Sequence, residues 1–498
     1  MPPKPSRPAK AAPLDGELAP GRVRVRMYRQ GIGDCFLVSI GRLAGGPFRL
    51  MVDCGVLLGT PNKDGLMQDV VRDLARTTGG KVDVLAVTHE HYDHVSGFAL
   101  ADAEFKGGTP GNPSGLKAGE TWFAWTEKPD DPLAQSIRKA RTDRIEKLHG
   151  MAEAMGAAGL DPGLAGSIGE VLDFFGAAGS RGSATADGMA RAGRLGASVC
   201  HLGPDEPPRT LPGLPGVRFY VLGPPRNETL LKRTFASDAV FHLDSAGCSG
   251  EAALMGAAGL DAARGPGGDD WSPFEAAYCH ALEAPVDGNP PMGGVQAFLN
   301  ERYWGSADDP QHPDQEWRRI GSDWLAAVSE FAMQLDAATN NTSLVLAIEA
   351  VATGKVLLLA ADAQVGSWQS WAGLSWTVDG RVVTGPDLLG RTVLYKVGHH
   401  GSQNATLNKE GLQLMPDGLV AFLPVDHAMA TVKHWDDMPL PKLLAVLNEK
   451  SGGKVVQMDQ PFPKALGGAS AEAHFTARDP EAPGLGGPLF YEWEGDFA

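Results

Sequence analysis

Residues 89–94 concentrate side chains that bind metals. The stretch reads HEHYDH and follows the apolar run VDVLAV, so it leaves the end of an expected buried strand. Imidazoles and carboxylates are costly to desolvate unless something satisfies them. His89 and His91 can face one centre, while the adjacent Asp93 and His94 can turn toward a second. Imidazole and carboxylate ligands together suit zinc, manganese or iron. The alternative is a polar loop with solvated histidines.

Three further apolar runs end in side chains of the same kinds. Asp53 ends RLMVD, where it either caps a turn or orients a ligand histidine. Asp362 ends KVLLLAAD and is either a turn residue or a bridge between two metals. His399 and His400 follow the run LYKVG. Taken together, the four strand ends predict a dinuclear metal site more strongly than any one of them does.

In order and residue type, these motifs resemble those of the metallo-β-lactamase fold superfamily: a strand-end Asp, HxHxDH, a His, a bridging Asp and a final His. Within it, the chain is most similar to the soluble domain of ComEC-type competence proteins. The matching pieces are RQGIGDCFLVSI, MVDCG, THEHYDHVSGF, YVLGPP, NNTSLVLAIE, VLLLAADA and LYKVGHHGS. They lie within residues 22–98 and 216–460. HxHxDH is specific to the superfamily, whereas the QGIGD and GHHGS pieces point to the ComEC-like branch.

The resemblance implies an α/β fold, a four-layer αββα sandwich with a large, mostly helical insertion. It also implies two divalent metal ions, Zn²⁺ or Mn²⁺. Asp53 and Asp34 would not bind the metals but would orient the residues that do. His400 is favoured over His399 as a ligand because Gly401 follows it. The implied ligands are His89 and His91 for the first metal, Asp93 and His94 for the second, Asp362 as the bridge, and His400 as the last ligand of the second metal.

The chain departs from the superfamily pattern at one ligand. None of the histidines between residues 94 and 399 ends an obvious strand, so the middle histidine is missing. The first metal would then be held by His89, His91, Asp362 and water, with Asn340 or Asn341 nearby. This puts occupancy of both metal positions in question.

The implied reaction is hydrolysis by a metal-bound hydroxide, because a metal lowers the pKa of bound water toward about 7. Asp93 or Asp362 would orient the water, and His399 would protonate the leaving group. No Ser/His/Asp or Cys/His nucleophile pattern and no Walker-type phosphate loop competes with this interpretation. Residues expected to contact the substrate are His434, Ser402, Lys396 and Asn341.

The ComEC-like branch implies a phosphodiesterase or nuclease that acts on DNA, RNA or a nucleotide. The alternatives are a small-molecule hydrolase of a lactone, thioester, β-lactam or phosphoester, and a non-enzymatic, metal-stabilised scaffold in a multi-protein complex. A net charge of −16 argues against a broad nucleic-acid surface and leaves a local groove. Arg138, Arg141 and Arg144 either steer a polyanion or form a solvated helix face.

The elements that position these residues fall into separate blocks. Expected strands and turns fill residues 22–98 and 339–460. We expect a flexible tail over 1–20 and a hydrolase domain over 21–98 and 216–498. Residues 99–215 are rich in Ala and Gly with helical spacing, so they predict a helical insertion, either a lid or an interface for a protein partner. A further irregular insertion is expected at about 223–338.

Composition limits the class of protein. The chain has 498 residues, 43% hydrophobic and 21% charged, which is enough for a sizeable core. It contains no run of 18 or more apolar residues, so no membrane-spanning helix and no membrane partner are expected. The five cysteines are scattered without a CxxC motif, which favours a reducing compartment, the cytoplasm.

Overall fold

The computed structural model describes residues 18–158, 169, 172, 175–176, 184–233, 335–433, 435, 437–466 and 488–498. Apart from residues 150–158 and 169, these belong to one compact unit, which comprises Met1–His149, Glu170–Asp244 and Leu335–Ala498. Most of the expected tail and most of the expected irregular insertion at 223–338 lie outside the described residues. The fold below is that of this unit.

The first β-sheet of the described chain contains both terminal strands. Its strands run in the order β16 (Phe490–Asp496), β1 (Arg22–Tyr28), β2 (Phe36–Ile40), β3 (Phe48–Val52), β4 (Lys81–Ala86), β5 (Lys117–Ala124) and β6 (Gly196–Leu202). Strands β16 to β3 pair antiparallel, and β3 to β6 pair in parallel. The parallel part brings the carboxyl ends of β3 and β4 to the same edge.

The second β-sheet is also mixed. Its strands run in the order β15 (Val455–Gln457), β14 (Val420–Leu423), β13 (Thr392–Lys396), β10 (Val356–Leu359), β9 (Val345–Ala350), β8 (Leu214–Gly223) and β7 (Arg209–Leu211). Strands β15, β14, β13 and β10 are parallel, and β10 to β7 are antiparallel. Here the carboxyl ends of β10 and β13 share an edge.

The two sheets share one hydrophobic core. In β2, Phe36, Val38 and Ile40 belong to this core, whereas Leu37 belongs to a cluster on the other face of the sheet. Such alternation is what a strand buried on both faces requires, since successive side chains point to opposite faces. The ring of Phe36 meets that of Phe422 from the second sheet edge-on, with centroids 6.3 Å apart. A register shift of one residue would turn these side chains to the wrong face.

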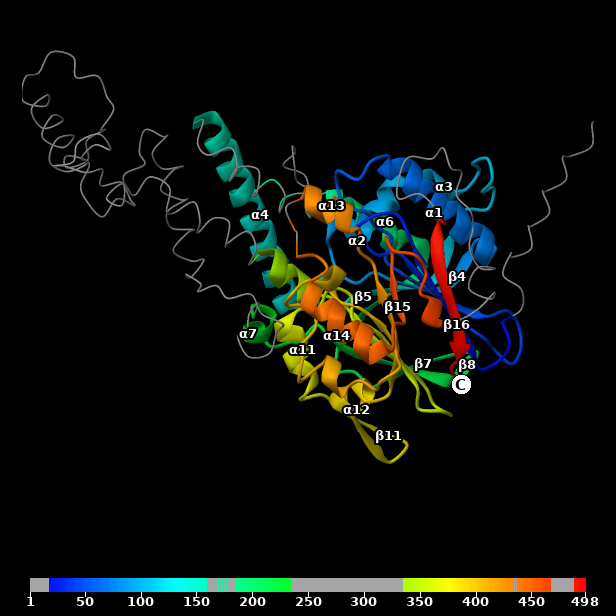
Figure 1. Cartoon of the computed structure of the whole chain (residues 1–498). Helices are drawn as coiled ribbons and strands as arrows, with labels where there is room; N and C mark the ends of the chain where they lie inside the picture. Colours follow the sequence, from blue (N-terminus) through cyan, green and yellow to red (C-terminus); the bar gives the residue numbers. More distant parts are fainter. Residues whose placement is uncertain are drawn as a thin grey trace, which may run out of the picture. The chain divides into compact units, whose positions relative to one another are not determined.

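Helices cover the other face of each sheet, as Figure 1 shows. Four helices pack on the first sheet: α1 (Lys63–Thr78), α2 (Tyr92–Leu100), α3 (Asp102–Lys106) and α6 (Ala184–Leu195). Three pack on the second: α11 (Val365–Trp371), α12 (Gly385–Leu389) and α14 (Pro441–Ser451). The α/β class predicted from the sequence is therefore confirmed.

The remaining elements are α4 (Pro132–Ala158), α7 (Glu228–Leu231), α13 (His427–Val432) and the hairpin of β11 (Ser375–Val378) and β12 (Arg381–Thr384), with short 3₁₀ turns between. None of the helices in the described part of the chain combines the length and the apolar character needed to cross a membrane.

The structure corrects the expected helical insertion over residues 99–215. Strands β5 and β6 lie in this range and extend the first sheet, with Trp122 paired to Cys200, and β7 joins the second sheet. The sequence hid these strands because β5 (KAGETWFA) and β6 (GASVCHL) interrupt their apolar residues with Gly and polar residues. The helices described in the range are α3, α4 and α6, together with the last turn of α2 and a short 3₁₀ turn.

Candidate metal centre

The residues with metal-binding side chains follow strands of both sheets. Asp53 follows β3 and residues 89–94 follow β4, its parallel neighbour. Asp362 follows β10, and His399 and His400 follow β13, which is parallel to β10. Parallel neighbours carry the loops after their carboxyl ends at one edge of the sheet, where ligand sites commonly form. The contacts below join these two edges.

Four buried side chains bring one donor atom each into a small space. Asp93 Oδ2 lies 2.9 Å from His400 Nε2 and 3.6 Å from His94 Nε2. Asp362 Oδ2 lies 3.1 Å from His94 Nε2 and 3.6 Å from His400 Nε2. A point equidistant from atoms so spaced lies roughly 2 to 2.4 Å from each, which includes the length of zinc–nitrogen and zinc–oxygen bonds. We call Asp93, His94, Asp362 and His400 the four-donor cluster.

The four-donor cluster also has the chemistry of a metal site. Its two imidazoles and two carboxylates are ligands that zinc and manganese accept. The second carboxylate oxygen of Asp93, Oδ1, is buried and has no hydrogen-bond partner, although the side chain is only 1% exposed. Buried polar atoms are rarely left unsatisfied. The cluster can therefore hold a metal ion, and its donor set does not distinguish zinc from manganese.

Hydrogen bonds orient both imidazoles of the cluster. His94 Nδ1 lies 2.8 Å from Asp53 Oδ2 and 3.9 Å from Asp34 Oδ2. His400 Nδ1 lies 2.6 Å from the backbone oxygen of Pro424. A proton held on Nδ1 by these acceptors leaves Nε2 of each ring as the nitrogen that can bind a metal. Asp53 thus bonds the ring nitrogen of His94 that points away from the cluster, and Asp34 lies close to the same nitrogen.

Four residues in the loops around the cluster have a left-handed backbone conformation. Asp53, Ala361, His399 and His400 have φ values of 54°, 50°, 36° and 52°. Residues other than glycine rarely adopt this left-handed region, and each such residue costs about 1–3 kcal/mol. Such costs concentrate at functional sites, because the surrounding structure must hold the residue in place.

The charges in the cluster balance one another. Burial alone would raise the pKa of Asp93, but His94 and His400 hold it at about 2. Burial would also raise the pKa of Asp362, but His94, Lys396 and His400 depress it. Conversely, burial would lower the pKa values of His94 and His400, but the carboxylates outweigh burial and raise both. The two carboxylates of the cluster are thus stabilised by positive charge. Protons on the histidines supply it in the metal-free chain, and a bound cation can supply it instead.

His89 and His91 form a separate pair. His89 Nε2 lies 3.1 Å from His91 Nδ1, and both side chains are buried. Among the described residues, neither histidine belongs to a group of three or more donors within 4.8 Å. Asp362 belongs to the four-donor cluster, and no group of three donors within 4.8 Å joins it to this pair in the described part of the chain.

Asp336, which the sequence analysis did not single out, approaches this pair. Its Oδ1 atom lies 3.7 Å from His91 Nε2, and its Oδ2 atom accepts a hydrogen bond of 3.1 Å from Asn340. Burial and the nearby carboxylates of Asp93 and Asp362 raise its pKa to about 8. Residues 335–340 are helical, and a spacing of four places Asp336 and Asn340 on one helix face. The spacing of four between Asp336 and Asn340, the first residue of NNTS, is the feature of the sequence that could have indicated Asp336 as a site residue.

His399 lies beside the four-donor cluster and not within it. Its Nδ1 atom contacts Ser402 Oγ at 2.9 Å and Gln364 Nε2 at 3.2 Å, and its Nε2 atom contacts Asn340 Nδ2 at 3.4 Å. Burial is the main reason that the pKa of His399 falls to about 4. The ring is therefore neutral at pH 7, and Ser402, expected to contact substrate, instead orients it.

Two residues expected to contact substrate have structural roles. The Lys396 ammonium donates to Asp34 Oδ2 at 2.5 Å and to Asp362 Oδ1 at 3.1 Å, and the residue is 2% exposed. The Asn341 side chain bonds only backbone groups, in the loop after α7 and at the start of α11. Both placements disagree with substrate binding, because the polar atoms are buried and already engaged. His434 lies outside the described residues.

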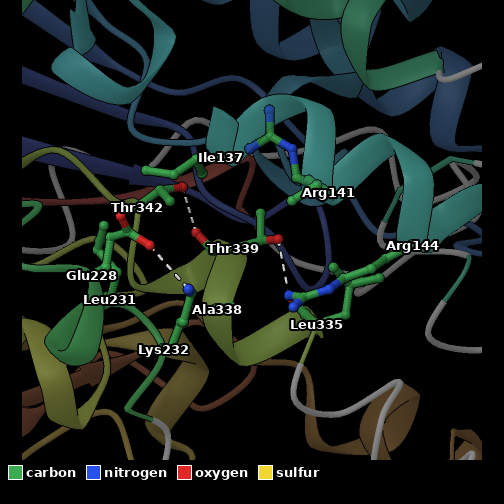
Figure 2. A pocket seen from close by; sticks show the side chains of 11 residues that line it. Ile137, Arg141, Arg144, Glu228, Leu231, Lys232, Leu335, Ala338, Thr339 and Thr342 are labelled. Carbon is green, nitrogen blue, oxygen red and sulfur yellow. Dashed lines mark hydrogen bonds and ion pairs between the residues drawn. The ribbon is translucent and has the colours of Figure 1, made fainter. Parts of the chain in front are cut away.

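The segment that carries Asp336 also contributes residues to a pocket. It has a volume of about 100 Å³ and is shown in Figure 2. Arg141 lines it and also bonds Glu90, the residue between the two paired histidines. Arg138, in contrast, donates to backbone oxygens. The lining residues are Ile137, Ala140, Arg141, Arg144, Glu228, Leu231, Lys232, Leu335, Ala338, Thr339 and Thr342.

Comparisons with known proteins do not identify a family for this chain. No protein-family model matches the chain, and no curated protein matches it.

Proposed function

We propose that the chain is a metal-dependent hydrolase of the metallo-β-lactamase fold superfamily. The observation that carries the proposal is the four-donor cluster, in which segments 269 residues apart, Asp93 and Asp362, meet with the spacing of metal ligands. Two mixed sheets with a shared core and helices on both outer faces support the four-layer αββα arrangement. The assignment to this superfamily and to its ComEC-like branch rests on the sequence motifs.

The residues of the chain would divide the work as follows. The four-donor cluster would hold one divalent cation, and His89 and His91 would hold a second. A bound divalent cation activates water as a nucleophile at neutral pH. His399 lies beside the cluster and would carry a proton to the leaving group. Ser402 and Asn340 fix the orientation of this ring.

We propose a phosphodiester of a nucleic acid or a nucleotide as the substrate. The ComEC-like motifs favour it. The pocket of Figure 2 is lined by Arg141, Arg144 and Lys232, of which Arg141 pairs with Glu90 and Lys232 with Glu228, in a chain whose net charge is −16. A phosphate bound there would exchange these carboxylate partners for its own oxygens and would need no broad basic surface. Cys35, Cys54 and Cys200 are free thiols, which supports a reducing compartment, and we place the protein in the cytoplasm within this proposal.

The test is turnover of defined substrates by metal-loaded protein. Single-stranded DNA, RNA and bis-p-nitrophenyl phosphate are expected to be hydrolysed with Zn²⁺ or Mn²⁺, and nitrocefin is not. The Asp93→Asn variant is the matched control and is expected to lose this activity, because it lacks one carboxylate of the cluster. Turnover of nitrocefin alone would replace the proposal with a small-molecule hydrolase. No turnover with any of these metals would favour a metal-stabilised scaffold.

A further inference from the structure

We propose that Asp336 is a positioning residue for the metal at His89 and His91. Its carboxylate would hold the proton on Nε2 of His91 and thereby keep Nδ1 of His91 free to bind the metal. The inference rests on the proposed metal centre but not on the reaction that the centre catalyses.

The two nitrogens of the His91 ring have different neighbours. Nδ1 lies 3.1 Å from His89 Nε2, a separation within the range of 2.9 to 3.6 Å found between atoms of the four-donor cluster. Those two nitrogens can therefore share a metal ion. The other nitrogen, Nε2, faces Asp336 Oδ1 at 3.7 Å. An imidazole that binds a metal usually donates its second N–H to a carboxylate, a carbonyl or water, which fixes the ring and its tautomer.

Asp336 is itself held in the orientation that this role needs. Its Oδ2 atom accepts from Asn340 Nδ2, so Oδ1 is the oxygen turned to His91. Oδ1 is buried and has no hydrogen-bond partner of its own. Asp93 and Asp362 lie nearby, and a further buried carboxylate beside them is costly without positive charge close by. A metal on the far nitrogen of His91 polarises the Nε2–H bond toward Asp336 and reduces that cost.

Direct binding of the metal by Asp336 is the competing arrangement. It would require His91 to bind through Nε2, away from His89. In the described structure, Asp336 joins no group of three donors within 4.8 Å, and neither does His89. The geometry therefore favours a carboxylate that faces Nε2 of His91 over one that binds the metal. The two arrangements place the His91 proton on opposite nitrogens, which makes them distinguishable.

The first readout is the tautomer of His91 in the zinc-loaded full chain, labelled with ¹⁵N at histidine. We expect an Nε2–H signal protected from exchange with water, assigned by its loss in His91→Gln. In Asp336→Ala this signal should shift and exchange faster. A proton on Nδ1 of His91 would overturn the proposal, and so would an Nε2–H signal unchanged by Asp336→Ala.

The second readout is zinc affinity from competition with a chelator. Asp336→Ala should weaken the weaker of two zinc sites by about 10–100-fold, the usual effect of removing such a partner, and leave the tighter site unchanged. Asp336→Asn keeps an oxygen acceptor, so its zinc affinity should lie between those of the wild type and Asp336→Ala. This variant keeps the test valid if the alanine variant misfolds. The control is Asp205→Ala, an exposed carboxylate that pairs with Arg226. Equal affinities in Asp336→Asn, Asp336→Ala and wild type would contradict the role. Zinc binding with the expected tautomer, but no phosphodiester turnover, would overturn only the proposed reaction.

Discussion

Asp93→Asn is expected to weaken metal binding at the four-donor cluster by more than the ~10–100-fold that follows loss of a residue that only orients a ligand. Asp93 contributes Oδ2 to the cluster, 2.9 Å from His400, and an Oδ1 atom that no hydrogen bond satisfies. The amide keeps the shape of the side chain but removes its negative charge. The metal would then meet only one carboxylate in the cluster, that of Asp362.

Two measurements on purified protein check this expectation. Competition with a chelator gives the affinity directly. Thermal unfolding gives it independently, because a metal that binds only the folded chain raises the unfolding temperature. The rise seen with zinc in the wild type should be absent in Asp93→Asn. Asp102→Asn, which removes an acid that pairs with Lys106 on its own helix and with Arg191 on α6, should behave like wild type. If Asp93→Asn binds zinc as tightly as that control, the cluster is not the metal site.

Lys396→Met is expected to lower the free energy of unfolding of the metal-free protein by about 3–5 kcal/mol. The methionine fills a similar volume but leaves Asp34 and Asp362 buried without their cation. Removing one partner of a buried ion pair costs this much because the remaining charge stays desolvated. Burial opposes the charged form of Lys396, yet the two carboxylates outweigh burial and raise its pKa, which shows how strongly they hold the ammonium.

Urea unfolding with and without zinc measures this effect. Zinc at the four-donor cluster supplies positive charge next to Asp362, so the loss caused by Lys396→Met should shrink in the zinc-loaded protein. Lys139→Met is the matched control: Lys139 is 76% exposed and pairs with Asp143, and such a surface pair contributes little to stability. A Lys396→Met variant no less stable than Lys139→Met would contradict a structural role for this lysine.

The strands that carry the metal-binding residues could be predicted because apolar residues dominate them, with Asp83 as the one polar residue in VDVLAV. VDVLAV and KVLLLAA are buried on both faces, and the structure confirms β4 and β10 there. His and Asp residues shortly after such runs then indicate the loops at the ends of the strands. The same reasoning failed for β5 and β6, because Gly119, Glu120 and Gly196 break the pattern that parallel pairing nevertheless tolerates.

Contacts between distant segments could not be predicted from residue types alone. Lys396 is followed by the HHG loop, and its sequence context does not reveal that Asp34 and Asp362 approach its ammonium. Asp336 lies in a short helical segment and ends no strand, so it carried no strand-end signal although it reaches His91. Glu90 lies between two histidines in the sequence, and this position does not reveal that Arg141 of α4 pairs with it. In each case tertiary packing decides the partner.

The most direct test of the central claim is diffraction from crystals of the zinc-loaded protein on both sides of the zinc absorption edge. We predict an anomalous peak between Asp93 Oδ2, His94 Nε2, Asp362 Oδ2 and His400 Nε2, with a second, weaker peak between His89 and His91. Zinc at other residues, or the four side chains still bonded to one another with no peak between them, would contradict a metal centre at this place.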